Sequence, residues 1–277
     1  MRQTVSGVST PFIMIGLLFS LMGQLAQASP LAESVVEVSP LGAIAEQSPA
    51  MLRTGIRDGL VGTGQVDPFL AETIAGIGSR AFSPKQIKVQ LAEDLAEDLD
   101  NTQLEAVRDW YDAPLGQRFA RAESRAASPD QWEAIRASAP ALRQQFEGSG
   151  RQQLFARYDR VTAASATAVE TAMAVQLELA ESLASLSAED TVESIQAQIE
   201  DNRPAIERQV NEQVYLAFLS MYQSFPDKDL ETYLQFLESP SGQAYIDSAG
   251  DAVRDAIMEP VGNVGNQLVR LLGSGGR

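Results

Sequence analysis

The chain has 277 residues and a formal net charge of −16, and it contains neither cysteine nor histidine. The absence of cysteine excludes thiolate nucleophiles, disulfides, structural zinc sites and iron–sulfur clusters. The absence of histidine removes the usual general base of hydrolases and the commonest transition-metal ligand. We therefore expect no cofactor, most familiar active sites are excluded, and the acidic charge argues against nucleic acid as a partner.

Residues 1–28 have the pattern of a secretory signal peptide. Arg2 gives a positive start, an apolar run extends from Phe12 to Met22, and Ala26-Gln27-Ala28 fits an A-x-A cleavage site. A permanent membrane helix needs about 20 apolar residues, and the run here is too short. We expect cleavage after Ala28, a periplasmic or secreted protein, and no stable membrane insertion after signal cleavage.

Residues 29–48 mix prolines with short apolar runs and are interpreted as a lead-in arm. From Pro49 onward alanine, leucine, glutamine, glutamate and arginine dominate, which predicts helices and no strands. A capping side chain before proline predicts helix starts at Asp67-Pro68, Ser83-Pro84, Ser128-Pro129 and Ser239-Pro240. Helix breaks are predicted at Pro140, at residues 148–150, at residues 202–204 and around Pro260.

A segment of the chain recurs when each residue is compared with the one 126 positions later, so that residues 100–123 match residues 226–249. Each copy predicts a short amphipathic helix, a sharp corner at a proline, and a second helix, and Thr102 and Glu105 have capping-box spacing in the first. The glycine after each proline leaves room for the preceding helix to pack closely. The positions expected to form the two corners are Leu104, Trp110, Pro114, Gly116 and Gln117, and Leu230, Phe236, Pro240, Gly242 and Gln243.

The run from Phe236 to Gln243 resembles the hallmark of the bacterial domain of unknown function family 2059. The resemblance covers about residues 203–250 and is weaker over 84–123, where Ala113 stands in place of a serine. It implies an exported helical protein, and it assigns no catalytic or binding residue to this chain.

The fold class expected from these patterns is all-α, a helical bundle of two pseudo-repeated helical-hairpin halves at residues 49–147 and 148–272. Arg151 to Leu186 contains neither glycine nor proline, so we expect one long helix there that joins the two halves. An amphipathic helix reaching Leu272 should dock on the core, and residues 273–277 should form a flexible tail.

Two charged clusters are candidates for ligand binding. Glu93, Asp94, Glu97 and Asp98 lie one turn apart on a predicted helix, where they could hold a hard cation such as calcium or form a solvated face. Arg118, Arg121 and Arg125 could share a helix face and bind a carboxylate or phosphate. Alternatively, the arginines of residues 118–160 pair with the acidic helices of the same chain.

These observations favour a non-catalytic periplasmic helical binding or scaffold protein of the cell envelope, whose partner is an unknown envelope protein or glycan. The first alternative is a carboxylate-dependent enzyme acting on cell-wall glycan, because two acidic side chains are enough for that chemistry. The second is a divalent-cation-responsive envelope protein that uses the cluster from Glu93 to Asp98.

Overall fold

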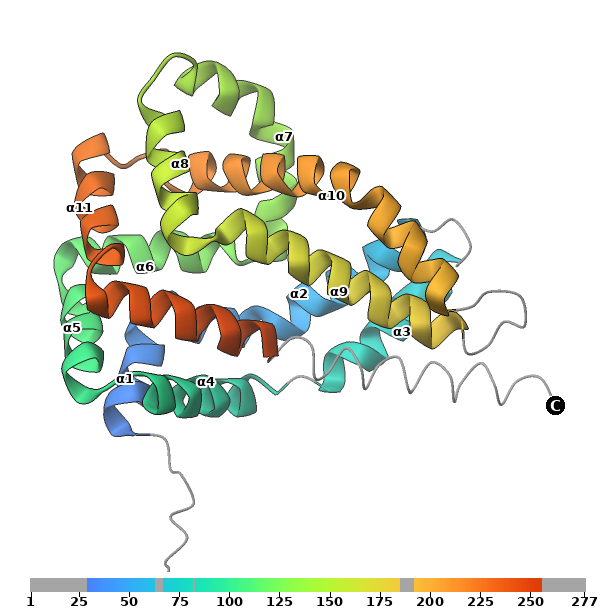
Figure 1. Ribbon diagram of the computed structural model, residues 1–277, viewed down its shortest axis with the longest axis horizontal. Helices are drawn as coiled ribbons and strands as arrows, with labels where there is room; N and C mark the ends of the chain where they lie inside the picture. Colours follow the sequence, from blue (N-terminus) through green and yellow to red (C-terminus); the bar gives the residue numbers. More distant parts are fainter. Residues whose placement is uncertain (1–28, 63–66, 82, 185–191, 256–277) are drawn as a thin grey trace, which may run out of the picture.

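The computed structural model describes residues 29–62, 67–81, 83–184 and 192–255, and these residues form helices and no strands (Figure 1). The all-α helical bundle is therefore confirmed. The predicted signal peptide, the docking helix beyond residue 255 and the tail lie outside the described residues. The helices are α1 (Pro30–Val38), α2 (Pro40–Gly62), α3 (Pro68–Gly78), the short 3-10 helix η1 (Ser79–Ala81), α4 (Pro84–Asp98), α5 (Asn101–Asp112), α6 (Pro114–Ala126), α7 (Pro129–Phe146), α8 (Arg151–Thr162), α9 (Ala164–Ala184), α10 (Val192–Met221) and α11 (Asp227–Leu237), and residues 240–255 are also helical.

The interpretation of residues 29–48 as a lead-in arm is wrong, because this segment is helical and belongs to the core. Ser29 caps α1, and its hydroxyl accepts a hydrogen bond from the Leu31 amide. Val35 and Val36 are almost fully buried in the same core as residues of α4 and α5. Burying each such side chain stabilises the fold by about 1.5–3 kcal/mol, which fixes the segment in place.

The four helix starts marked by a cap and a proline are confirmed. Asp67 and Ser83 each accept a hydrogen bond from an amide of the first turn of α3 and α4, and Ser239 does the same for the Gly242 amide. Ser128 occupies the cap position of α7 without a side-chain hydrogen bond. The first amides of a helix have no partner within it, so proline at this place costs no hydrogen bond.

Proline does not break the helices where breaks were predicted at Pro140 and at residues 202–204. Pro140 lies inside α7 and Pro204 inside α10, which bends along its length in Figure 1. An internal proline costs about 3 kcal/mol. Neighbouring side chains offset this cost by packing into hydrophobic clusters, as Ala139 and Ile206 do. The break predicted at residues 148–150 does separate α7 from α8.

The long helix predicted over 151–186 is interrupted at Ala163, whose backbone is left-handed with φ 49°. The Asp159 carboxylate accepts a hydrogen bond from the Ser165 amide at 2.7 Å, and so caps the start of α9. A residue other than glycine in the left-handed conformation costs about 1–2 kcal/mol. The hydrogen bond from Ser165 to Asp159 offsets part of this cost. Beyond the turn α9 packs along α10.

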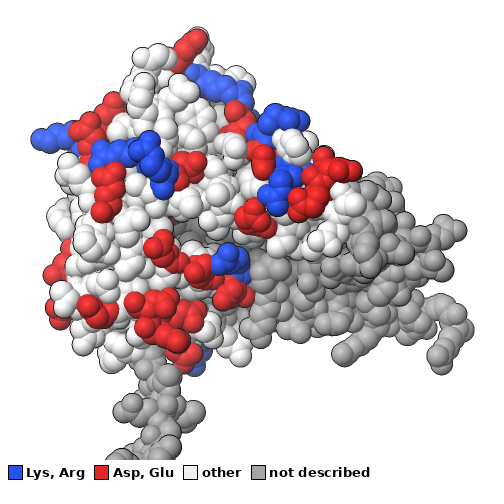
Figure 2. Space-filling view, in the orientation of Figure 1, with Lys and Arg blue, Asp and Glu red and all other residues white. Residues whose placement is uncertain are grey.

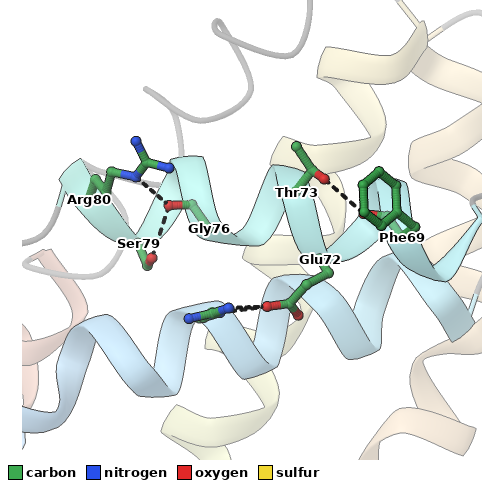
Figure 3. A network of polar contacts seen from close by, with 7 residues as sticks. Phe69, Glu72, Thr73, Gly76, Ser79 and Arg80 are labelled. Carbon is green, nitrogen blue, oxygen red and sulfur yellow. Dashed lines mark hydrogen bonds and ion pairs between the residues drawn. The ribbon is translucent and has the colours of Figure 1, made fainter.

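The helices α2 and α3 form an outlying hairpin with a small hydrophobic cluster of its own, formed by Ile56, Ala71, Ile74 and Ala75. An ion pair between Arg53 of α2 and Glu72 of α3 joins the two helices (Figure 3). Both side chains are exposed, so this pair contributes little to stability. Phe69 stands out on α3 because it is 82% exposed.

Candidate functional site

The two copies of the helix corner have nearly the same geometry. A Cβ atom added to Gly116 would lie 1.9 Å from the Trp110 carbonyl oxygen, and one added to Gly242 would lie 2.0 Å from that of Phe236. Any larger residue would push the two helices of the corner apart. The glycines thus set the close approach of α6 to α5 and of the 240–255 helix to α11.

The glutamine after each glycine holds its corner from the outside. The Gln117 side chain donates a hydrogen bond to the Asp112 carbonyl at 2.9 Å, and the Gln243 side chain donates one to the Leu237 carbonyl at 2.9 Å. These carbonyls end α5 and α11, where the helix itself provides no donor. The capping box at the start of α5 is made by Asp100 and Gln103 rather than by the predicted Thr102 and Glu105.

The two corners pack directly against each other at matched positions. Trp110 and its counterpart Phe236 stack with ring centroids 4.7 Å apart and planes 7° apart. Tyr111 contacts Tyr245 edge-on, with ring centroids 5.7 Å apart. In the repeat Tyr111 corresponds to Leu237 and Tyr245 to Phe119, and these two counterparts lie together in the other core. Reciprocal contacts of this kind are what a two-fold interface produces, here within one chain. The interface between the halves therefore includes the two corners, and α8 also contributes to it, because Leu154 lies in one cluster with Phe119 and Leu142 of the first half.

This crossed packing separates the two main hydrophobic cores. The first core contains buried residues of α1, α2, α4, α5 and the 240–255 helix together with Ala120 of α6, and the second contains those of α6, α7, α8, α11 and the end of α10 with the loop after it. The first helix of each copy thus shares a core with the second helix of the other. Leu104 and Leu230, which match in the repeat, are each 1% exposed, one in each core.

A cavity of about 350 Å³ lies where the two copies meet. Four tyrosines from four different helices line it, together with one carboxylate, that of Glu123 on α6. Apolar side chains, small side chains and Arg254 complete the described part of the wall. The tyrosines are Tyr111 of α5, Tyr158 of α8, Tyr233 of α11 and Tyr245 of the 240–255 helix.

The Glu123 carboxylate sits in surroundings that favour its neutral form. Burial raises its pKa to about 7, while hydrogen bonds from Tyr222 and Tyr233 oppose the rise. The Tyr222 hydroxyl donates one of these bonds at 2.5 Å. A carboxyl with such a pKa exchanges its proton near neutral pH, which is common at functional sites and uncommon elsewhere.

The tyrosine hydroxyls around Glu123 keep their protons throughout the neutral range. Burial raises the pKa of Tyr111 and Tyr233 well above the usual value, and it raises those of Tyr158 and Tyr245 as well. The nearby Glu123 charge adds to the rise at each of them. The cavity therefore presents neutral phenol groups and one titratable acid.

The predicted arginine cluster is partly used for internal pairing. Arg118 forms an ion pair with Asp229 of α11 at 2.9 Å and lies over the Phe225 ring. Arg121 and Arg125 are exposed on α6. The anion site thus stays a prediction, and its leading member is already bound to a carboxylate.

Other arginines of residues 118–160 pair with acids outside that segment. Arg143 pairs with Glu212 and Arg157 with Glu238. Arg151 is only 5% exposed; it forms an ion pair with Asp227 and donates hydrogen bonds to the backbone carbonyls of Tyr222 and Phe225. On the face drawn in Figure 2, blue side chains in the upper half lie next to red ones, whereas red side chains gather around α4. Internal pairing therefore accounts for much of the local positive charge.

The acidic cluster on α4 does not form a metal site. In the part of the chain that the structure describes, no three side chains of the ligand types His, Cys, Asp and Glu are arranged to hold a metal ion. Glu97 and Asp98 are exposed, and Asp94 accepts a hydrogen bond from Gln90 one turn earlier. This arrangement is that of a solvated helix face.

Sequence reasoning missed Glu123, although two signals pointed to it. Glu123 follows Gly116, Phe119 and Ala120 at the spacing of one helix face, and that face is buried. Its counterpart in the second copy is Ala249, so a half-buried acid stands where the second copy has a buried alanine. An acid on the buried face of a repeated helix is a signal of function.

None of the helices in the described ranges is long and apolar enough to span a membrane. The resemblance to the bacterial domain of unknown function family 2059 remains an expectation drawn from the corner motif. No protein-family pattern, no curated protein and no solved structure matches the chain.

Proposed function

We propose that this chain is a non-catalytic binding protein of the bacterial cell envelope, in which the paired corners frame a small ligand-binding cavity. The observation that carries the proposal is the cavity of about 350 Å³ beside Glu123. Small-molecule sites in proteins measure about 300–1,000 Å³ and combine an apolar wall with a few polar groups. The signal sequence expected at residues 1–28 supports an envelope location.

The rigid surroundings of the cavity also support binding. Its lining residues come from helices that are far apart in the sequence and are joined by the stacked pair of Trp110 and Phe236. Gln243 reaches across to the Val161 carbonyl at 3.4 Å, and so joins the second corner to the end of α8. A cavity held by packed helices loses little conformational entropy when a ligand enters.

The glycan-cleaving alternative has weaker support. Such enzymes place two carboxyl groups on opposite sides of the bond to be cleaved. In the part of the lining that the structure describes, Glu123 is the one carboxylate in the cavity between the corners. A second cavity, of about 490 Å³, is lined by Asp227 and Glu231, but these lie one turn apart on α11 and Asp227 pairs with Arg151.

The cation-responsive alternative also has weaker support. It relied on the cluster from Glu93 to Asp98, in which only Glu97 and Asp98 are fully exposed, and the described residues include no group of acids that converges as a hard cation needs.

A cavity-blocking variant tests the binding function. Gly250 lines the cavity, and a Cβ added to it would meet nothing within 4 Å, so Gly250→Phe should fill the cavity without disturbing the helix. The melting temperature is measured with a panel of neutral, anionic and cationic small molecules. We expect some compounds to stabilise the parent protein and a Gly250→Ala control, and to leave Gly250→Phe unchanged. If no compound distinguishes the parent protein from Gly250→Phe, the proposed function is wrong.

A further inference from the structure

We infer that the cavity between the corners binds a small organic ammonium ion, which the Glu123 carboxylate and the surrounding tyrosine rings hold together. This inference rests on the proposed binding function and specifies the chemical class of its ligand. It follows from the charge inside the cavity, the aromatic wall, the shape of the remaining lining and the charge of the whole protein.

Among the residues that the structure describes, none forms an ion pair with the carboxylate in the cavity. Its hydrogen bonds come from neutral phenols, with Tyr222 donating at 2.5 Å. Arg254 is the one basic residue in the described lining, and it is exposed and paired with Asp251 one turn earlier. A carboxylate that is partly withdrawn from water is stabilised in its ionised form by a positive charge beside it. A cationic ligand would supply that charge.

The aromatic wall suits a positive charge that carries alkyl groups. Tyr111, Tyr233 and Tyr245 are 1%, 3% and 4% exposed, and Tyr158 is half-buried beside them. An aromatic ring attracts a cation within about 6 Å of its centroid, and cages of several rings recognise quaternary ammonium groups. Because the phenols stay neutral, their rings keep this property across the physiological pH range.

The rest of the lining favours an organic cation over a metal ion. Leu41, Ile44 and Ile246 contribute apolar surface, and a single carboxylate supplies at most two oxygen ligands. Calcium binds about six to eight oxygen ligands, and magnesium retains most of its bound water molecules, so neither ion suits a site with one carboxylate. An alkylammonium ion loses less hydration on entering such a site and gains contact with the apolar wall.

The charge of the whole protein acts in the same direction. A formal charge of −16 raises the local concentration of cations near the surface and lowers that of anions. This long-range effect carries no specificity by itself. It does increase the rate at which a cation reaches a cavity that already selects for its charge.

Choline and its neutral analogue 3,3-dimethylbutan-1-ol form a matched pair of probes, because the two have nearly the same shape and differ in the charge. Isothermal titration calorimetry with the full chain at pH 8 compares them. We expect choline to bind at least tenfold more tightly than the analogue. Equal binding of the two, lost in Gly250→Phe, would overturn the inference about charge and leave the proposed function standing. Absence of choline binding would overturn the inference as well, while the wider compound panel still decides the proposed function.

Variants separate the charge from the rings. Glu123→Gln keeps the shape of the side chain, so it should weaken choline binding at least tenfold and leave the analogue unaffected. Glu133→Gln, on the exposed surface of α7, is the matched control and should bind choline like the parent protein. Tyr158→Leu should weaken choline binding, whereas Tyr158→Phe, which keeps the ring, should retain it. Circular dichroism verifies that each variant is folded.

The pH dependence gives an independent readout. The tyrosines facing Glu123 are Tyr111, Tyr158, Tyr222, Tyr233 and Tyr245, whose raised pKa values keep them neutral in this range. The charged Arg254 also lines the cavity and is paired with Asp251. Among the described residues, Glu123 is therefore the group that titrates in the cavity between pH 6 and pH 8. Because Glu123 must lose its proton to bind a cation, choline should bind about tenfold more tightly at pH 8 than at pH 6. The Glu123→Gln variant should show no such change. A parent protein with the same affinity at both pH values would contradict the inference.

Discussion

Replacing Glu123 by glutamine should stabilise the protein at pH 8 and have a much smaller effect at pH 4. Glutamine has nearly the same shape as the protonated glutamate and keeps an oxygen that accepts the hydrogen bond from Tyr222. The substitution therefore removes the buried charge and little else. The change in the free energy of unfolding therefore measures how much ionisation of Glu123 destabilises the folded protein.

The expected size follows from the two pKa values of Glu123. The pKa rises from 4.5 to about 7 on folding. Below pH 4.5 the group is protonated in both states, and its contribution to stability is fully present. Between pH 4.5 and pH 7 the unfolded chain releases the proton while the folded protein keeps it, so stability falls as pH rises. The loss levels off above pH 7 at about 3 kcal/mol.

Urea denaturation of both proteins at pH values from 4 to 8 measures this difference, because the contributions of all other groups cancel between parent and variant. The free energy of unfolding of Glu123→Gln, relative to that of the parent protein, should rise by about 3 kcal/mol between pH 4.5 and pH 7 and then stay constant. A difference that does not change with pH would refute the reasoning. It would show that Glu123 has an ordinary pKa in the folded protein.

Further substitutions test the corners and the buried Arg151 at the start of α8. Gly116→Ala should lower the free energy of unfolding, measured by urea denaturation, by at least ~3 kcal/mol, because the added Cβ would overlap the Trp110 carbonyl. Gly250→Ala should instead raise it by about 0.5–1 kcal/mol, because its Cβ meets no atom. Equal effects of the two substitutions would contradict the close-approach argument. Trp110→Phe should change the free energy of unfolding by less than about 1 kcal/mol, because the buried Trp110 Nε1 has no hydrogen-bond partner among the described residues. Trp110→Ala should lower it by about 3–5 kcal/mol. Thermal denaturation distinguishes the two variants. Arg151→Met should lower the free energy of unfolding by about 3 kcal/mol, since it leaves two backbone carbonyls and Asp227 without their buried donor. An unchanged free energy of unfolding would contradict this prediction, because it would mean that water replaces the guanidinium.

The helical class and the corners could be predicted from the sequence because their signals are local. A cap followed by proline fixes a helix start within a few residues, as at Asp67 and Ser83. The corner requires proline and glycine two positions apart, and both copies have the geometry that this spacing implies at Gly116 and Gly242. Such features depend on backbone sterics and so need no knowledge of distant residues.

The features that were predicted wrongly depend on contacts between distant segments. Residues 29–48 lack the composition of a strong helix, yet Val35 and Val36 fill the core formed with α4 and α5. Pro204 would end an isolated helix, but packing of Ile206 and of the neighbouring turns keeps α10 continuous. The turn at Ala163 has neither glycine nor proline, and it relies on the Asp159 side chain.

The candidate site could be found only in part. The repeat predicted two corners, but it did not predict that Trp110 would stack on its own counterpart, Phe236, or that residues of both copies would line one cavity. Glu123 was one of many acids in the sequence, and its importance comes from burial among tyrosines of four helices. Arg118, which was singled out, turned out to pair with Asp229.

The most direct test of the account is carbon-13 NMR of the Glu123 side-chain carboxyl, titrated from pH 3 to pH 9 with and without saturating choline. The carboxyl should titrate near pH 7 in the free protein. The midpoint should move to lower pH with choline bound, because the ammonium charge favours the ionised form. A midpoint near 4.5 that choline leaves unchanged would contradict both the buried charge and the cation site.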